Sequence, residues 1–134
     1  MPEHAAVLFA NDAFYLAFAG RDMAAMDDVW AKKTPVSCVH PGWAPISERA
    51  EVMESWRAIL TGPAAPKITC AGPTVRIVGD VAWVVCHEVL DQGFLVATNI
   101  FVREDGRWKI IHHQAGAAPP PSAETDQPPP ETMQ

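Results

Sequence analysis

The stretch that most constrains the fold of this 134-residue chain runs from Thr74 to Gln114. It is rich in Val, Ile, Phe and Trp, which favour strands, and three short turn signals divide it. These signals are Gly79-Asp80, Asp91-Gln92-Gly93 and Asp105-Gly106, which are typical of tight hairpins. The pattern therefore predicts four consecutive antiparallel strands, which form the sheet of an α+β domain.

The residues before this sheet predict three helices, at residues 3–19, 23–30 and 47–60. Apolar side chains return at helical spacing in each of them, as expected for helices that cover a sheet. Asp22 and Ser47 stand where the N-caps of the second and third helices are expected. A short strand is expected at residues 35–40, because a proline follows it. A further strand at residues 67–78 contains Gly72-Pro73, which predicts a bulge or a sheet edge.

Length and composition indicate one domain, residues 1–117, followed by a disordered Pro-rich tail, residues 118–134. The net charge is −6 and no basic patch is present, so nucleic acid is not expected as a partner. The N-terminus resembles neither a signal peptide nor a membrane span. The three cysteines show no paired spacing, which suits a reducing compartment. We therefore expect a cytoplasmic protein that binds neither nucleic acid nor membranes.

The register of the hairpins predicts which side chains share a face of the sheet. A two-residue turn at Asp105-Gly106 pairs Asn99 with His112, and a turn that pairs Leu90 with Phe94 places Trp83 opposite Phe101. The predicted inner face holds Trp83, Val85, His87, Asn99, Phe101, Trp108, Ile110, His112 and Gln114. The predicted outer face holds Val84, Cys86, Glu88, Val96, Thr98, Ile100, Lys109, Ile111 and His113.

The inner face combines apolar side chains with four polar ones, His87, Asn99, His112 and Gln114. Apolar walls with a few convergent polar groups are typical of a ligand pocket, so we expect a cavity for a small, mainly apolar molecule. Because Glu88 is assigned to the outer face, no carboxylate is expected in this cavity. The outer face is also largely apolar, which predicts a homodimer formed through it.

The order helix, helix, strand, helix, four-stranded meander resembles the nuclear transport factor 2-like superfamily, in its SnoaL-like and ketosteroid-isomerase-like branch. The resemblance rests on Cys38–Trp43, on Gly79–Trp83 and on the closing run Asp105–His113, and it covers about residues 5 to 117. It implies a curved sheet around a cone-shaped cavity that the helices cover, commonly in a dimer. Members of the family are isomerases, cyclases, dehydratases, assembly domains or ligand binders, so the fold alone does not give the function.

The resemblance also points to particular residues. His40, before a proline, stands where ketosteroid-isomerase-like proteins have a general-base aspartate, and a histidine can serve as a base near neutral pH. The family's closing pattern Trp-x-x-x-His-x-His-x-Ser is kept at Trp108 and His112, but Gln114 replaces its second histidine. Tyr15 lies on the helix from which the isomerases donate to an oxyanion.

We therefore predict His40 and His112 as catalytic residues. The predicted ligand-binding residues are Tyr15, Trp43, Trp56, Trp83, His87, Asn99 and Gln114. Each has a structural alternative: His40 as a cap of its strand, the tryptophans as core, and Asn99 with His112 as a buried hydrogen-bonded pair.

An alternative interpretation is a metal site formed by His40, His87 and His112. Imidazoles suit zinc, but the sequence has no HxxxH or CxxC spacing and offers no acidic ligand beside them. We expect neither a metal nor another cofactor. Two classes of function stay open: a non-catalytic binding or assembly module, and an isomerase, cyclase or dehydratase that uses His40 as its base.

Overall fold

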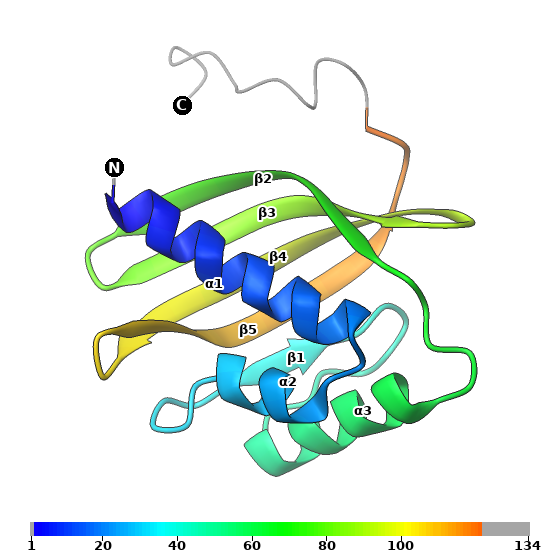
Figure 1. Ribbon diagram of the computed structural model, residues 1–134, viewed down its shortest axis with the longest axis horizontal. Coiled ribbons are helices and arrows are strands. Elements are labelled where there is room, and N and C mark those ends of the chain that lie inside the picture. The colour runs from blue at the N-terminus through cyan, green and yellow to red at the C-terminus, as the bar shows by residue number, and fades with distance from the viewer. Residues whose placement is uncertain (1, 122–134) are drawn as a thin grey trace.

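The computed structural model describes residues 2–121, which form one layer of helices on a five-stranded sheet (Figure 1). The helices are α1 (Pro2–Ala19), α2 (Met23–Val29) and α3 (Arg49–Thr61). The strands are β1 (Ser37–Val39), β2 (Thr69–Val78), β3 (Val81–Leu90), β4 (Gly93–Glu104) and β5 (Arg107–Ala118). The strand order is β1-β5-β4-β3-β2, and the predicted α+β fold is confirmed.

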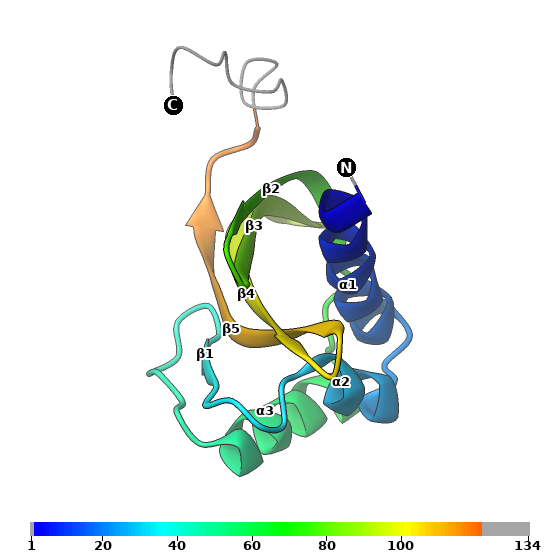
Figure 2. The ribbon, with the colours of Figure 1, turned by 90° about the vertical axis from the view of Figure 1, so that its left-hand side faces the viewer.

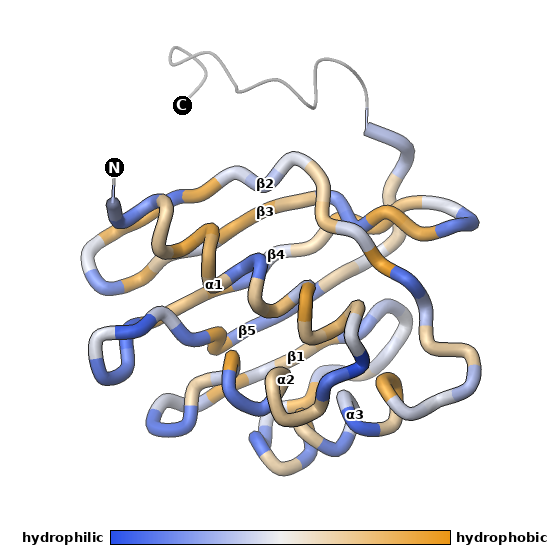
Figure 3. Tube along the Cα trace, viewed as in Figure 1, coloured by the Kyte–Doolittle hydropathy of each residue, from blue (hydrophilic) through white to orange (hydrophobic). Residues whose placement is uncertain are grey.

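The sheet is strongly curved, and α1 lies across its concave side, while α2 and α3 lie near β1 (Figure 2). The core fills the space between helices and sheet, where Phe14, Trp30, Trp56, Phe101 and Ile110 are fully buried. The turns that join the long strands are hydrophilic, and the strands between them carry the hydrophobic residues (Figure 3). The concave side therefore determines which side chains can form a buried site.

The two edges of the sheet are formed by β1 and β2. Strand β1 pairs with β5 in parallel, and β2 forms the opposite edge. The register of β2 against β3 shifts between Ala71 and Thr74, where Gly72 adopts a φ of +60°. The bulge and the edge position predicted from Gly72-Pro73 are both confirmed, because a proline cannot donate to a second neighbouring strand.

The helix starts were predicted in part. Asp22 Oδ1 accepts a hydrogen bond from the Ala25 N–H at 3.0 Å, so the cap of α2 is confirmed. The cap predicted at Ser47 is wrong, because α3 begins at Arg49 and Glu48 occupies the N-cap position without a side-chain cap. Instead, the Arg49 guanidinium donates to the carbonyl oxygen of Ala31 at 2.8 Å and to Asp27 Oδ1 at 2.9 Å. The end of α2 thereby fixes the start of α3.

The predicted register of β3 against β4 is wrong by one residue. The turn has two residues, because Leu90 pairs with Gly93 rather than with Phe94. Val84 consequently pairs with Asn99, and Glu88 with Leu95. Since neighbouring side chains in a strand point to opposite faces, this shift reverses the assignment of the whole strand. The inner face of β3 holds Ala82, Val84, Cys86 and Glu88, and its outer face holds Trp83, Val85 and His87.

A bulge divides the pairing of β4 with β5. Asp105 and Gly106 have φ angles of +53° and +78°, and the predicted two-residue turn and the pairs Arg103–Trp108 and Phe101–Ile110 are confirmed. Next in the ladder, Ile100 pairs with His112, so one extra residue lies in β5. Asn99 therefore pairs with His113 instead of His112. His113 points inward and is 2% exposed, which corrects its predicted outer position.

The strand β5 ends one residue beyond the predicted domain boundary at residue 117. Residues 122–134 of the predicted Pro-rich tail lie outside the described residues. Within residues 2–121, none of the helices has the combined length and apolarity that crossing a membrane requires.

Candidate functional site

A cavity of about 280 Å³ lies between the helices and the concave side of the sheet. Most of its wall is apolar, and three polar side chains interrupt it: His40 after β1, Glu88 on β3 and His113 on β5. The other lining residues are Phe18, Pro41, Trp43, Trp56, Ile59, Pro66, Ile68, Leu90 and Leu95. We call this space the His40–Glu88 cavity.

Glu88 provides the carboxyl group that the sequence analysis did not expect here. It is 1% exposed, and the Tyr15 hydroxyl donates a hydrogen bond to its Oε2 at 2.7 Å. Burial raises the pKa of Glu88, and the Tyr15 hydrogen bond opposes this only in part. Burial and the nearby carboxyl group also raise the pKa of Tyr15, so its hydroxyl keeps the proton that it donates. The prediction that Glu88 faces outward is wrong.

Behind Glu88, a chain of hydrogen bonds joins α1 to β4 and β5. Asn99 Nδ2 donates to Asn11 Oδ1 at 2.9 Å and to the Tyr15 hydroxyl oxygen at 3.3 Å. With its amide nitrogen oriented this way, Asn99 presents Oδ1 to His113 Nδ1 at 2.6 Å. His113 Nδ1 must therefore carry the proton, because Asn99 Oδ1 can only accept. Its other ring nitrogen, Nε2, keeps a lone pair.

His113 is neutral in the folded protein. Its pKa is lowered to about 3, mainly by burial and further by the charges that His40 and His112 would carry. The imidazole therefore acts in this wall as a polar but uncharged group at neutral pH. It contacts the ring of Phe14, whose centroid lies 5.0 Å away.

His40 is held by a second, shorter chain of hydrogen bonds. The Ser55 hydroxyl donates to the Val52 carbonyl oxygen at 2.6 Å, and Ser55 Oγ lies 2.8 Å from His40 Nε2. Because a hydroxyl has one proton, Ser55 must accept from His40, which places the imidazole proton on Nε2. Burial lowers the pKa of His40 to about 4. At neutral pH the ring is therefore uncharged, with a lone pair on Nδ1.

The structure brings together only some of the predicted site residues. His40, Trp43 and Trp56 line the cavity, and Tyr15 and Asn99 lie behind its wall in the hydrogen-bonded chain. Four predicted residues lie on the outer face of the sheet instead: Trp83, His87, His112 and Gln114. They are excluded from the cavity by the two-residue turn of β3–β4 and by the bulge in β5.

His112 makes its contacts on that outer face. Its Nδ1 lies 2.6 Å from Ser37 Oγ, and its Nε2 lies 3.2 Å from Gln114 Oε1. The predicted pair of Asn99 with His112 is replaced by Asn99 with His113, the next residue in the chain. The catalytic assignment of His112 therefore has no support from its position.

Four residues of this site were not predicted from the sequence: Glu88, His113, Ser55 and Asn11. The sequence did contain a signal for Glu88. Val84, Cys86 and Glu88 occupy alternate positions of β3 and so share one face, and two apolar side chains followed by a carboxylate suit a pocket that has apolar walls and one polar group. That signal was not decisive, since Trp83, Val85 and His87 alternate in the same way. Nothing in the sequence marked the bulge that turns His113 inward.

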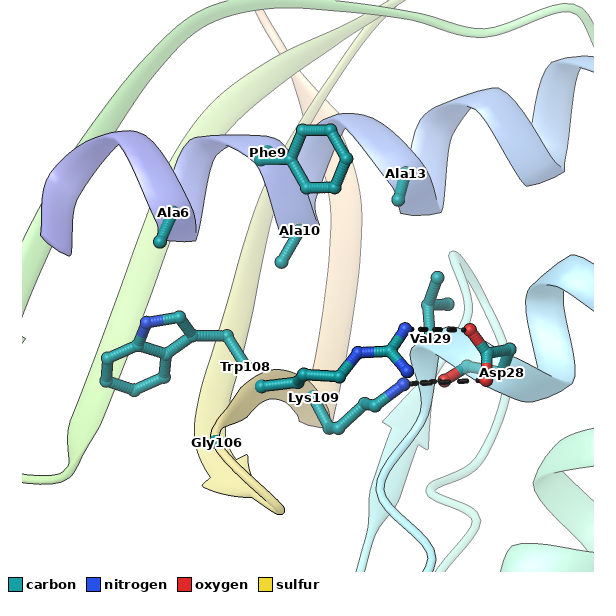
Figure 4. Close-up of a pocket in the computed structure, with 10 residues that line it drawn as sticks. Ala6, Phe9, Ala10, Ala13, Asp28, Val29, Gly106, Trp108 and Lys109 are labelled. Carbon is teal, nitrogen blue, oxygen red and sulfur yellow. Dashed lines mark hydrogen bonds and ion pairs between the residues drawn. The ribbon is translucent and has the colours of Figure 1, made fainter. Parts of the chain in front are cut away.

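A second hollow lies between the N-terminal half of α1 and the β4–β5 turn (Figure 4). Its wall includes Phe9, Trp108 and Lys109. The charged groups there are already engaged: Arg107 forms an ion pair with Asp28 at 3.4 Å, and Lys109 Nζ donates to the Asp28 carbonyl oxygen at 2.6 Å. Because this hollow has no buried titratable group, the His40–Glu88 cavity is the better candidate site.

Within residues 2–121, no group of three or more His, Cys, Asp or Glu side chains is arranged to hold a metal ion. The thiol of Cys38 lies 3.6 Å from His40 Nε2, and burial raises the pKa of this thiol to about 12. A protonated thiol is a poor metal ligand and a poor nucleophile. The chemistry of the cavity therefore rests on oxygen and nitrogen groups.

Comparisons with known proteins agree with this architecture. An F-box protein of Arabidopsis thaliana, SKIP8, is 29% identical over 112 residues, which are 82% of this chain. The chain spans about half, 48%, of that relative's length. A solved structure of a proposed dehydratase of the NTF2-like family from Streptomyces avermitilis is 29% identical, with a TM-score of 0.80. The match covers 87% of this chain and 97% of that protein.

A second solved structure is a proposed association domain of calcium/calmodulin-dependent protein kinase type II from Thiobacillus denitrificans. It is 30% identical with a TM-score of 0.73, and the match covers 81% of this chain and 92% of that protein. The model of the SnoaL-like domain family matches residues 7–119. The chain belongs to the SnoaL-like family, with the NTF2-like fold that the sequence analysis predicted.

Proposed function

We propose that this protein binds a small, uncharged and mainly apolar molecule in the His40–Glu88 cavity. One observation carries the proposal: the buried polar groups Glu88, His40 and His113 interrupt the wall of one otherwise apolar cavity. Such a combination is typical of sites that hold a ligand by apolar contact and orient it by a few polar groups. The cavity volume, about 280 Å³, suits a molecule of roughly the size of a substituted aromatic ring.

The charge of the wall supports an uncharged ligand. Among residues 2–121, those that line the cavity include no Lys or Arg, and the pKa values of both imidazoles are lowered well below neutrality. An anion placed there would lose its hydration without gaining a counter-charge, which is strongly unfavourable. A neutral molecule avoids this penalty.

Binding can be measured with acetophenone as an uncharged aromatic probe, by NMR titration of the labelled protein. Leu95→Trp should abolish binding, because a larger side chain on the cavity wall occupies the space. Leu16→Trp is the matched control, since this leucine of α1 is 71% exposed and does not line the cavity. If the wild type binds no probe, or if Leu95→Trp binds as well as Leu16→Trp, the proposal is wrong.

An alternative function is an enzyme of the isomerase, cyclase or dehydratase type. It is supported by the pairing of an acid with a raised pKa, Glu88, and neutral imidazoles in one cavity. The similarity to a proposed dehydratase agrees with it. For a β-hydroxy ketone, His40 Nδ1 would take the proton next to the carbonyl and Glu88 would protonate the departing hydroxyl. The products are an enone and water. His40 then releases the proton that it took to solvent, and Glu88 takes up a proton from solvent, which restores both groups.

The alternative predicts proton exchange even where no product forms. The methyl protons of acetophenone lie next to its carbonyl, so a base that removes them in D₂O replaces them with deuterium. Wild-type protein should accelerate this exchange, and His40→Asn should return it to the protein-free rate while the Kd stays within about threefold. His112→Asn, on the outer face, should exchange as fast as the wild type. An unchanged rate in His40→Asn ends the role of His40 as the base.

We further propose that the outer sheet face pairs with a second copy of the chain. It carries exposed apolar side chains, with Val85 at 37% and Val96 at 39% exposure. On the same face, half-buried Trp83 pairs with half-buried Ile100 on the adjacent strand, next to Val85 along β3. An apolar face of this kind is typical of an interface, and the likeness to a proposed association domain agrees with an assembly role.

A further inference from the structure

His113 brings an unpaired ring nitrogen to the wall of the His40–Glu88 cavity. The residue lines the cavity and is 2% exposed. Its Nδ1 contacts Asn99 Oδ1 at 2.6 Å, and its Nε2 has no hydrogen-bond partner among residues 2–121. The side-chain polar atoms of these residues that are both unpaired and closed to solvent are the indole nitrogens of Trp30 and Trp56. His113 Nε2 is not among them, so it keeps accessible surface, and the cavity is the space that its side chain borders.

The hydrogen-bond chain behind this imidazole determines what Nε2 can do. Tyr15 donates its one proton to Glu88, so the Tyr15 oxygen accepts from Asn99 Nδ2. Asn99 therefore turns its carbonyl oxygen to His113, and Nδ1 holds the ring proton. At neutral pH the ring takes up no second proton, because burial lowers its pKa to about 3. Nε2 is consequently an acceptor, and only a donor can pair with it.

The other two polar groups of the wall differ from His113 Nε2. The Cys38 thiol lies 3.9 Å from His40 Nδ1, and it keeps a proton to donate to that nitrogen because burial raises its pKa to about 12. Burial raises the pKa of Glu88 and so favours its protonated form. In that form Oε1 carries the proton, because Oε2 accepts from Tyr15. Among these groups, His113 Nε2 is therefore the acceptor that lacks both a partner and a proton.

A ligand without a donor would cover His113 Nε2 and leave it unpaired, which is unfavourable. A hydroxyl group avoids this penalty, because it is uncharged and carries a proton that it can donate. We infer that the cavity selects uncharged, mainly apolar molecules with a phenol- or alcohol-type hydroxyl group, and that this hydroxyl donates a hydrogen bond to His113 Nε2. The inference rests on the proposed binding function and names its ligand class.

The compounds para-ethylphenol and para-ethylfluorobenzene form a suitable pair of probes, since they have nearly the same shape and fluorine cannot donate. In wild-type protein with ¹⁵N-labelled histidine, NMR correlations within the ring should show the His113 proton on Nδ1. The Nε2 signal should lie further upfield in the ethylphenol complex than in the ethylfluorobenzene complex, because accepting a hydrogen bond shields this nitrogen. Contacts of the ring protons with Phe14, whose centroid lies 5.0 Å away, assign the signals to His113.

The affinities provide a second readout. The ratio of the ethylphenol Kd to the ethylfluorobenzene Kd should rise about fivefold to tenfold in His113→Phe, the loss expected for one hydrogen bond. The different hydration of the two probes cancels when this ratio is compared between proteins. His4→Phe is the matched control, because this exposed histidine of α1 does not line the cavity. It should keep the wild-type ratio.

Three results overturn the inference and leave the binding function standing, provided that acetophenone or either probe binds the wild type. They are a ring proton on Nε2, equal Nε2 signals in the two complexes, and an unchanged ratio in His113→Phe. The same conclusion follows if ethylphenol alone fails to bind, or if the ratio rises in Glu88→Gln or His40→Phe and not in His113→Phe. If neither the probes nor acetophenone bind, the proposed function fails together with the inference. Should His113→Phe not fold, the Nε2 signals of the two wild-type complexes decide alone.

Discussion

Replacing His113 should reduce the acid sensitivity of the fold. The pKa of His113 is lowered to about 3 in the folded protein, whereas an unfolded histidine titrates near 6.5. Between these two values the unfolded chain binds a proton that the folded chain does not. A depressed pKa contributes stability that is present above pH 6.5 and is lost as the pH falls toward 3. His113 therefore makes the protein less stable on acidification.

The size of this effect follows from the two pKa values. Each pH unit inside the window changes the free energy of unfolding by up to about 1.4 kcal/mol. From pH 7.5 to pH 5, one such histidine accounts for a loss of about 2 kcal/mol, a large part of the stability of a small domain. His113→Asn removes this contribution, although it also lowers stability at every pH, by about 1–3 kcal/mol, if its 2.6 Å bond to Asn99 is lost.

The assay is urea unfolding followed by tryptophan fluorescence at several pH values between 5 and 7.5. The slope of the unfolding free energy against pH should be smaller for His113→Asn than for the wild type, by nearly one proton near pH 5 and by less toward pH 7.5. His112→Asn is the matched control, because this neighbouring imidazole lies on the outer face and contacts Ser37. The reasoning is refuted if His113→Asn keeps the wild-type slope, or if His112→Asn is the variant that loses it.

Three further variants test other parts of the structure. Because the pKa of Glu88 is raised in the folded protein, the unfolding free energy of the wild type should fall as the pH rises from about 4.5 through that raised pKa. Glu88→Gln should lack this fall in urea unfolding, and equal pH dependence of the two proteins would contradict the raised pKa of Glu88. Tyr15→Phe leaves Glu88 and Asn99 each short of a partner and should cost about 1–3 kcal/mol; a loss below about 0.3 kcal/mol in the same assay would show that the hydroxyl is dispensable. Ile100→Glu should convert a dimer into a monomer in sedimentation experiments, because a buried interface does not tolerate an unpaired charge, whereas Ala58→Glu on the exposed face of α3 should not; a monomeric wild type would disprove the interface.

Features that depend on the local chain were predictable. The hairpin at Asp105-Gly106, the bulge at Gly72-Pro73 and the cap at Asp22 were all found where they were expected. Each depends on the backbone preferences of the residues themselves, such as the tolerance of glycine for positive φ angles. The position of His40 was predictable for a similar reason, since the proline that follows it ends the strand and leaves His40 at the sheet margin.

Features that depend on contacts between distant segments were not predictable in the same way. The expected cap at Ser47 failed because Arg49 is anchored by Asp27 and Ala31 at the end of α2. Trp56 was expected to line the cavity, and does, because the helical pattern of α3 already pointed it toward the sheet. That its buried indole N–H has no hydrogen-bond partner among residues 2–121 is a property of the tertiary structure alone.

The order of the elements and the positions of the turns follow from local signals in the chain. The tertiary structure alone decided which polar groups enter the His40–Glu88 cavity. The side chains of a strand alternate with a period of two, so one residue more or less in a turn or a bulge exchanges the two faces. The two-residue turn after Leu90 brings Glu88 to Tyr15, and the extra residue in β5 brings His113 to Asn99. These choices are fixed by burial and hydrogen bonding against α1, which lies far from both strands in the sequence.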